Sequence, residues 1–380
     1  MTADRVWVLG ATGRCGRAIA ARLTAGHLPP VLVGRDPGRL HELAGALGGK
    51  PRIVVTGSVD AITAQLTRHA PAVVINTIGP FTETAAPIAR ACPPGTHYVD
   101  LANELSAVTG LLGRREEAIA AGRCLVTGAG FGVLATESLV LRLCEDRPPA
   151  ACVRVDAVPK AVAGDGLVGC ALAASIVDSL ALGGRRYEHG RLVRTRLGAD
   201  AEWFALPDGT RAHTVGGPSG ELEAAHRASG APFVVAATSA VPAGRAARAV
   251  LPVAAVLLSH PVPARAAKRR LARVRVTTRG RSGEFSWARA RVRDVDGRTL
   301  EGWLRTGPAT EFTAAVAAGV ASRLVRGEGR PGAHTPGSLF GPELAVEAGG
   351  RFLLGRPSLL DGRFTSFPSG KGHPGHASDG

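Results

Sequence analysis

Residues 6–16, VWVLGATGRCG, place three glycines in one turn between an apolar run and a helical pattern. The spacing Gly10-x-x-Gly13-x-x-Gly16 is a variant of the GxGxxG turn of dinucleotide-binding folds. In such a turn Gly10 allows a sharp bend, Gly13 lets backbone N–H groups approach a pyrophosphate, and Gly16 lets helix and strand pack closely. A plain corner would need only one of these glycines. The turn therefore predicts phosphate binding at a helix N-terminus, through Gly10, Ala11, Thr12, Gly13, Arg14, Cys15 and Gly16.

The same alternation of apolar run and helical pattern continues to about residue 145. Strands are expected at VWVLG, VLVGR, RIVVTG, AVVINTIG, HYVDLA and CLVTGAG. Continuous apolar runs are typical of strands that helices cover on both faces. We therefore predict an α/β protein whose N-terminal half is a Rossmann-type, doubly wound parallel sheet.

A second α+β domain built on an antiparallel sheet is expected after residue 150. LARVRVTTRG, FSWARARVRDVDG and TLEGWLRTG alternate in the manner of an antiparallel meander, and helices are expected at 310–325 and 338–347. The predicted division is 1–150 for the dinucleotide-binding domain, 151–308 for a substrate or oligomerisation domain, 309–355 for helices returning to the first domain, and 356–380 for a flexible tail. In RVRV and ARARVRD the arginines share one strand face, which we expect to meet water or a partner subunit, with an anionic ligand or nucleic acid as the alternative.

Composition narrows the class of protein. The chain has 380 residues, 46 Lys and Arg against 31 Asp and Glu, and only 4% aromatic residues. The arginines are spread along the chain, so we interpret the charge of +15 as an Arg-rich surface and expect no nucleic acid partner. No run approaches the roughly 18 apolar residues of a membrane span. The scattered cysteines and the absence of a leader pattern at the N-terminus favour the cytoplasm, and nothing indicates a metal site.

The second expected strand ends in VGRDP, where Arg35 and Asp36 compete for the cofactor ribose. An acidic residue there favours NAD, whereas an arginine favours the additional phosphate of NADP. Asp36 precedes Pro37 in the pattern of a helix N-cap followed by its first residue. This leaves Arg35 for the phosphate, and we expect NADP(H) as the cofactor.

Four further stretches carry a family resemblance: NTIGPF, HYVDLANE, GAGFGVLATESL and TPGSLFG. With the glycine turn they resemble the saccharopine dehydrogenase-like NADP-binding oxidoreductases, including the trans-acting enoyl reductase branch. The resemblance covers most of the first 145 residues, returns at about 306–350 and implies the fold and the cofactor. The third stretch departs from the family pattern GFDSVPxD, because Gly132-Val133 replaces Asp-Ser and Glu137 replaces Asp.

Three of these stretches follow expected strand ends, on the edge of the sheet where ligands bind in such folds. In NTIGPF, Asn76 is a candidate polar contact for the nicotinamide ribose, and Gly79, Pro80 and Phe81 are expected either to bend the chain over it or to form only a rigid turn. In GAGFG, Gly130 and Phe131 are expected to pack against the nicotinamide.

Candidate catalytic groups gather after the fifth strand. Tyr98, Asp100 and Glu104 could supply a proton to a reduced double bond, although Asp100 or Glu104 could equally cap a helix. Lys160 begins the second domain and is either a proton donor, a ligand for a substrate carboxylate, or an exposed lysine.

These observations predict an NADPH-dependent reductase of a C=N or activated C=C bond in a small or carrier-bound metabolite. A non-catalytic NADP(H) sensor is the alternative, since the same fold can bind cofactor without turnover. A nucleic-acid or membrane-surface protein would require the arginines to form one continuous patch. A homodimer is one assembly compatible with the expected arginine face.

Overall fold

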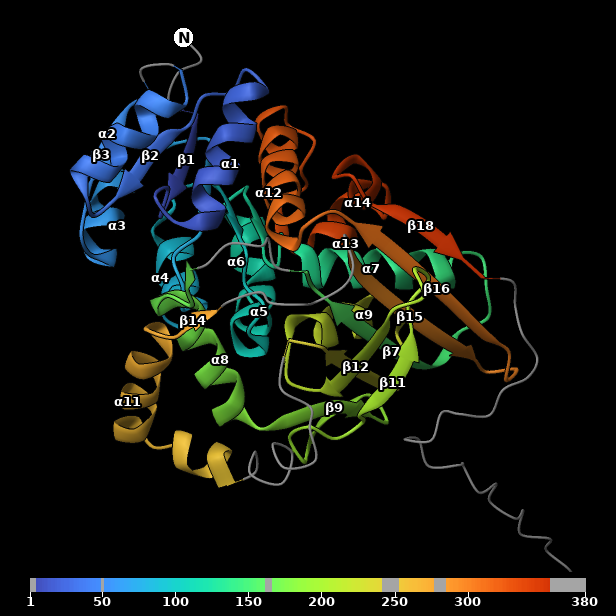
Figure 1. The fold of residues 1–380 in the computed structure, drawn as a ribbon. Coiled ribbons are helices and arrows are strands. Elements are labelled where there is room, and N and C mark those ends of the chain that lie inside the picture. Colours follow the sequence, from blue (N-terminus) through green and yellow to red (C-terminus); the bar gives the residue numbers. More distant parts are fainter. Residues whose placement is uncertain (1–4, 49–50, 161–165, 241–252, 277–284, 356–380) are drawn as a thin grey trace, which may run out of the picture.

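The computed structural model describes residues 5–48, 51–160, 166–240, 253–276 and 285–355. Its first sheet has seven strands, all paired in parallel, in the order β17-β6-β5-β4-β1-β2-β3 (Figure 1). Their bounds are β1 Val6–Leu9, β2 Val31–Gly34, β3 Ile53–Val55, β4 Val73–Asn76, β5 His97–Asp100, β6 Cys124–Val126 and β17 Gly332–His334. The predicted doubly wound sheet is confirmed, and β17 adds a strand that the sequence did not predict.

Both faces of this sheet are buried. Val6 and Val8 of β1 pack in one apolar cluster with α1, α2 and α12, whereas Trp7 and Leu9 pack in another with α3 and α4. The alternation of side chains along a strand explains this division. The helices are α1 Arg14–Ala25, α2 Pro37–Ala46, α3 Val59–His69, α4 Phe81–Ala91, α5 Leu105–Leu112, α6 Arg115–Ala120 and α12 Ala309–Val325.

The second sheet has nine strands and is mixed. Its main path is β10-β9-β13-β7-β15-β16-β18, and β12 joins β11 to β13. All pairs are antiparallel except β13 with β7. The bounds are β7 Ala150–Val158, β9 Gly184–Glu188, β10 Arg191–Thr195, β11 Glu202–Ala205, β12 Arg211–Gly216, β13 Phe233–Thr238, β15 Ser286–Asp294, β16 Thr299–Thr306 and β18 Arg351–Leu354. Helices α7 Phe131–Cys144 and α9 Gly220–Ser229 cover one face.

The prediction of the first strand of the meander is wrong. Residues 271–272 end helix α11, Pro261–Ala272, and β14, Arg275–Val276, pairs with β8, Gly166–Leu167, in a separate two-stranded sheet. Alanine, arginine and lysine dominate α11 and favour a helix, which the Arg-Val alternation concealed. The rest of that run lies outside the described residues. The other two strands, β15 and β16, pair as predicted.

The prediction of one helix at 338–347 is also wrong, because the chain forms two short helices here. They are α13, Pro336–Phe340, and α14, Glu343–Glu347. Gly341 adopts a φ of +79° and Pro342 follows it, which together stop α13 and restart the chain. The helix predicted at 310–325 is confirmed as α12, which packs on α1.

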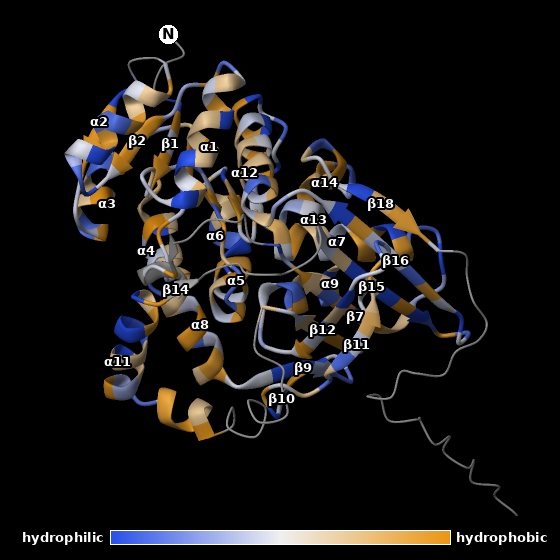
Figure 2. Cartoon of the chain, in the orientation of Figure 1, coloured by the Kyte–Doolittle hydropathy of each residue, from blue (hydrophilic) through white to orange (hydrophobic). Residues whose placement is uncertain are grey.

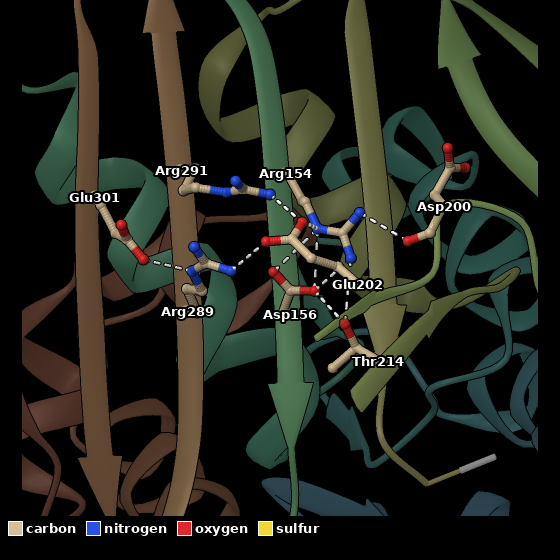
Figure 3. Close-up of polar contacts among 8 residues, drawn as sticks. All are labelled: Arg154, Asp156, Asp200, Glu202, Thr214, Arg289, Arg291 and Glu301. Carbon is tan, nitrogen blue, oxygen red and sulfur yellow. Dashed lines mark hydrogen bonds and ion pairs between the residues drawn. The ribbon is translucent and has the colours of Figure 1, made fainter. Parts of the chain in front are cut away.

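The arginine face of β15 is covered by its own chain. Arg289 and Arg291 form ion pairs with Glu202 of β11, and Arg289 also pairs with Glu301 of β16 (Figure 3). Beside them Arg154 binds Asp156 at 2.8 Å. The expectation that this face meets water or a partner subunit is therefore wrong for these side chains. Glu202 on β11 lies far from β15 in the sequence, so the alternation alone could not show this partner.

No helix in the described ranges is long and apolar enough to span a bilayer. The described parts of the predicted C-terminal return pack on both sheets, with β17 beside β6 and β18 beside β16. The expected tail at 356–380 lies outside the described residues.

Glu137 joins two of the stretches that carried the family resemblance. Its carboxylate, buried within α7, accepts hydrogen bonds from the backbone N–H groups of Gly337 at 2.9 Å and Ser338 at 3.0 Å, and from the Thr335 hydroxyl. A Cβ at Gly337 would lie 2.6 Å from this carboxylate, so TPGSLFG needs glycine here. Burial raises the pKa of Glu137 to about 7.

Replacing Glu137 by Gln should lower the free energy of unfolding by about 1–3 kcal/mol, because an amide donor would then face backbone or hydroxyl donors. The folded pKa lies above the ordinary value, so the folded state keeps a proton that the unfolded state has lost. The stability from this group is therefore full at low pH and decreases as the pH rises to about 7. Thermal melts across this pH range should show that the melting temperature of E137Q depends less steeply on pH than that of the wild type. The exposed control Glu42→Gln should behave as the wild type, and an unchanged E137Q would contradict the assignment.

Candidate functional site

The glycine turn lies between β1 and α1, as the sequence predicts. Gly10 has a φ of +76°, and the N–H groups of Gly10 and Ala11 both donate to the Val33 carbonyl of β2. A Cβ at Gly10 would lie 2.8 Å from the Thr77 hydroxyl oxygen. The bend and the neighbouring strand β4 therefore both require glycine at this position.

Gly16 and Gly13 have different surroundings. A Cβ at Gly16 would lie 2.4 Å from the Gly10 carbonyl oxygen, so this glycine lets α1 approach β1. At Gly13 a Cβ would meet only the Gly10 carbonyl, at 3.1 Å. Gly13 is the N-cap of α1, and no side-chain oxygen of the described residues caps this N-terminus. The first backbone N–H groups of α1 thus form a cradle that fits a phosphate.

The loop after β2 contains the two residues that were expected to compete for the cofactor ribose, Arg35 and Asp36. Asp36 accepts a hydrogen bond from the Arg39 backbone N–H at 3.0 Å, so its predicted role as the N-cap of α2 is confirmed. Arg35 directly precedes it and is exposed.

Two further arginines lie at this end of the sheet. Arg39 Nη2 and Arg17 Nε donate to the Thr12 carbonyl at 3.1 and 3.0 Å. Sequence reasoning missed both as candidates for a phosphate site. Their positions in the sequence could have indicated them, because Arg39 follows the Asp36 cap by three residues and Arg17 directly follows Gly16.

Asn76, at the end of β4, organises the NTIGPF turn. Its side-chain oxygen accepts from Ile78 N–H at 2.9 Å, and its amide donates to the Tyr98 hydroxyl at 3.0 Å. Thr84 of α4 donates to the Ile78 carbonyl. Pro80 is the N-cap of α4, and Phe81 is its first residue. These bonds make Gly79-Pro80 a rigid turn beside the glycine turn.

Tyr98 and Asp100 are fully buried on one face of β5. Burial raises the pKa of Tyr98 well above its ordinary value. Asp100 Oδ1 accepts from Ala102 N–H at 3.0 Å, from the Thr127 hydroxyl at 2.8 Å and from Gly128 N–H at 3.2 Å. Burial raises the pKa of Asp100 to about 6. Asp100 thus fastens the loop after β6 to the end of β5.

Glu104 connects three segments at the same edge. Its carboxylate accepts from Phe81 N–H at 3.3 Å, from Asn103 N–H at 3.1 Å and from the hydroxyl of Ser175. Ser175 belongs to α8, Cys170–Leu182, and Phe81 begins α4. The carboxylate therefore joins the loop after β5 to the N-terminus of α4 and to α8.

The GAGFG loop contacts the first turns of α12. Phe131 N–H donates to the Thr313 hydroxyl oxygen at 3.0 Å. The rings of Phe131 and Phe312 pack edge to face, with their centroids 6.0 Å apart. A Cβ at Gly130 would lie 3.3 Å from the Thr313 methyl carbon. The Lys160 carbonyl accepts from Ala309 N–H at the start of the same helix. Helix α12 thus brings the Gly130 loop and Lys160 to one region.

Glu221, in the first turn of α9, was missed by sequence reasoning. A Cβ at Gly132 would lie 2.2 Å from Glu221 Oε1, and Asn103 donates to the same oxygen at 3.2 Å. Oε2 is buried and has no hydrogen-bond partner among the described residues. Burial raises the pKa of Glu221. In the sequence only Gly132 could have pointed to Glu221. This glycine departs from the family pattern and leaves the space that the Glu221 carboxylate fills.

Comparison with known proteins gives two informative matches, and no family profile matches the chain. The trans-acting enoyl reductase of Mycobacterium leprae is 28% identical over 154 residues, which are 38% of this chain and 37% of that protein. The matched segment thus spans well under two thirds of that relative. The apo structure of saccharopine dehydrogenase (L-Glu forming) from Saccharomyces cerevisiae superposes with a TM-score of 0.58 at 12% identity, over 93% of this chain and all of that one. The resemblance predicted from the sequence is confirmed, and the fold is that of saccharopine dehydrogenase.

Gly13→Val and Gly16→Val should have opposite consequences. A side chain at Gly13 would project into the cradle, so NADPH binding should be lost while the melting temperature changes little. A side chain at Gly16 would collide with the Gly10 carbonyl, so the fold itself should be destabilised. NADPH fluorescence and circular dichroism on the same samples measure both effects, with Gly45→Val on α2 as control. Undiminished binding by G13V would mean that the glycines serve only the turn.

Proposed function

We propose that this chain, which has the saccharopine dehydrogenase fold, is an NADPH-dependent oxidoreductase that reduces a C=N or activated C=C bond. The observation that carries the proposal is the uncapped N-terminus of α1, set by three glycines at the carboxyl edge of a parallel sheet. A small or carrier-bound substrate fits the enoyl reductase named among the relatives.

The choice of NADPH over NADH rests on charge. Asp36 is occupied as a helix cap, so its carboxylate is not available to the ribose hydroxyls. Arg35 lies directly beside it, and Arg39 lies in the first turn of α2 with its guanidinium donating to the Thr12 carbonyl. Arginine recognises phosphate through charge-assisted hydrogen bonds, which favours a cofactor with a 2′-phosphate.

A bound NADPH supplies the hydride for such a reduction and becomes NADP⁺. The chain has to hold the acceptor carbon near the nicotinamide and deliver one proton to the neighbouring atom of the double bond. The NTIGPF turn, the GAGFG loop and the first turns of α12 are the segments assigned to holding the nicotinamide end. Gly79 and Gly130 contribute to these segments through backbone shape, and Asn76 contributes through its side-chain hydrogen bonds to Ile78 and Tyr98.

The candidates for the proton donor are the four groups predicted from the sequence and Glu221. Asp100 and Glu104 each accept three hydrogen bonds. Glu221 and Asp100 each have one buried oxygen with no hydrogen-bond partner in the described ranges, and burial raises the pKa of both groups. A raised pKa favours the protonated form of a carboxyl group, which is the form that general acid catalysis requires.

Replacing Arg35 by Ala should weaken NADPH binding by roughly 10–100-fold, because a charge-assisted hydrogen bond to the 2′-phosphate is lost. NADH binding should not change, since it has no phosphate at that position. Calorimetry with both cofactors measures the difference, and Arg191→Ala on β10 is the control with the same loss of charge. Equal affinities of the wild type for NADPH and NADH would refute the choice of cofactor.

At least one variant among Tyr98→Phe, Asp100→Asn, Glu104→Gln, Lys160→Met and Glu221→Gln should lose about 10²–10⁴-fold in turnover while binding NADPH normally. A panel of enoyl-pantetheine thioesters and imines, followed by NADPH absorbance, provides the assay. Melting temperatures separate this loss from the roughly 1 kcal/mol expected of a lost structural contact. NADPH binding without consumption of any substrate, combined with a protein partnership that depends on the cofactor, would favour the sensor instead.

A further inference from the structure

A helical projection stands beside α4 at the edge of the molecule (Figure 1). It consists of α8 and residues 253–274, which include α11 and a helical segment at 253–258, and we call it the arm. Lys268 of α11 pairs with Asp178 of α8 at 2.8 Å and lies 3.9 Å from Glu83 of α4. Thr82 of α4 also contacts Asp178. The arm is therefore fastened to the first turn of α4, and no residue of α11 is buried.

Large aliphatic side chains of the arm face outward. Val256 is 65% exposed, Leu257 is 55% exposed and Val262 is 73% exposed. Val253, Val256 and Leu257 have the i, i+3, i+4 spacing that places them on one face of the helical segment. Figure 2 shows this segment in the colours of apolar residues beside the more hydrophilic α11. Exposed apolar side chains gathered in one place mark an interaction surface.

The same arm carries a concentrated positive charge. Four arginines of this part of the arm are exposed: Arg265, Arg269, Arg270 and Arg273. The sequence contains no Asp or Glu from residue 224 to residue 283. Asp178, the one acidic residue of α8, already pairs with Lys268. The exposed arginines thus lie in or directly after α11, in the same arm as the exposed aliphatic side chains.

We propose that the arm binds the surface of a membrane that contains anionic lipid. The aliphatic side chains would enter the boundary between headgroups and acyl chains, and the arginines would pair with lipid phosphates. Nucleic acid fits this surface less well, because residues 239–284 contain no Phe, Trp or Tyr on which bases could stack. Apolar side chains on the outer face also have no use against a phosphate backbone.

The position of the arm gives this binding a consequence for the candidate site. Ser175 of α8 donates to Glu104, which also accepts from the N-terminus of α4. The membrane-binding surface therefore belongs to the same set of contacts as the loop after β5.

Cosedimentation of the full chain with vesicles tests the proposal. We expect binding to vesicles of phosphatidylcholine mixed with an equal amount of phosphatidylglycerol, weak binding to phosphatidylcholine alone, and loss of binding at high salt. Val256→Asp should reduce partitioning by at least about tenfold. Arg269→Gln with Arg270→Gln should reduce it by about fivefold for each arginine.

Matched controls lie outside the arm. Val295→Asp alters a valine that is 62% exposed, and Arg191→Gln with Arg194→Gln removes the same charge from β10. Both controls should bind as the wild type. Equal loss in the controls, or equal binding to both kinds of vesicle, would overturn the proposal, as would the absence of binding.

Two other occupants of the surface give distinct results. If a second copy of the chain covers the aliphatic patch, light scattering will show a dimer that V256D converts to a monomer. If nucleic acid is the partner, a single-stranded oligonucleotide will bind more tightly than the vesicles and V256D will not weaken it. Either result would refute membrane binding. NADPH affinity is measured in parallel, so failure of this proposal is distinguishable from failure of the proposed function.

Discussion

The close approach of α1 to the end of β1 determines most of the geometry of the candidate site. With a side chain at Gly16 this approach would be impossible, because its Cβ would fall 2.4 Å from the Gly10 carbonyl. The approach puts the uncapped N-terminus of α1 at the carboxyl edge of the sheet. It also sets the surface on which α12 packs, and α12 carries Thr313 to the loop at Gly130. One glycine contact therefore positions both the phosphate end and the opposite end of the region assigned to the cofactor.

Buried carboxyl groups hold the loops around this region. Asp100, Glu104 and Glu137 each accept three hydrogen bonds, and each joins segments distant in the sequence. A carboxylate is tolerated in the interior when hydrogen-bond donors surround it. The same hydrogen bonds hold the segments that carry these donors in place. Asp100 and Glu221 each keep one buried oxygen without a hydrogen-bond partner among the described residues, whereas both oxygens of Glu104 and of Glu137 accept hydrogen bonds. This difference separates two carboxyl groups that could exchange protons from two that serve as anchors.

Local signals account for what the sequence predicted correctly. The glycine turn, the Asp36 cap and the apolar strands of the first sheet each depend on residues within a few positions of one another. The ion pairs of Arg289 were missed because Glu202 lies far from β15 in the sequence. The same holds for Glu137 with Gly337, and for Gly132 with Glu221. For Glu137 and Gly132 the family stretches indicated that the residue mattered, while the partner that explains it was visible only in the fold.

The place of β17 has a consequence for the order in which the protein can assemble. The first six strands of the parallel sheet are complete by residue 126, but the strand beside β6 comes from residues 332–334. Between them the chain builds the entire second sheet apart from its last strand, β18. During synthesis β6 therefore stays an open edge until nearly the whole chain has emerged from the ribosome. An unpaired apolar edge invites pairing with other chains, so a nascent chain of this topology has reason to depend on holding chaperones.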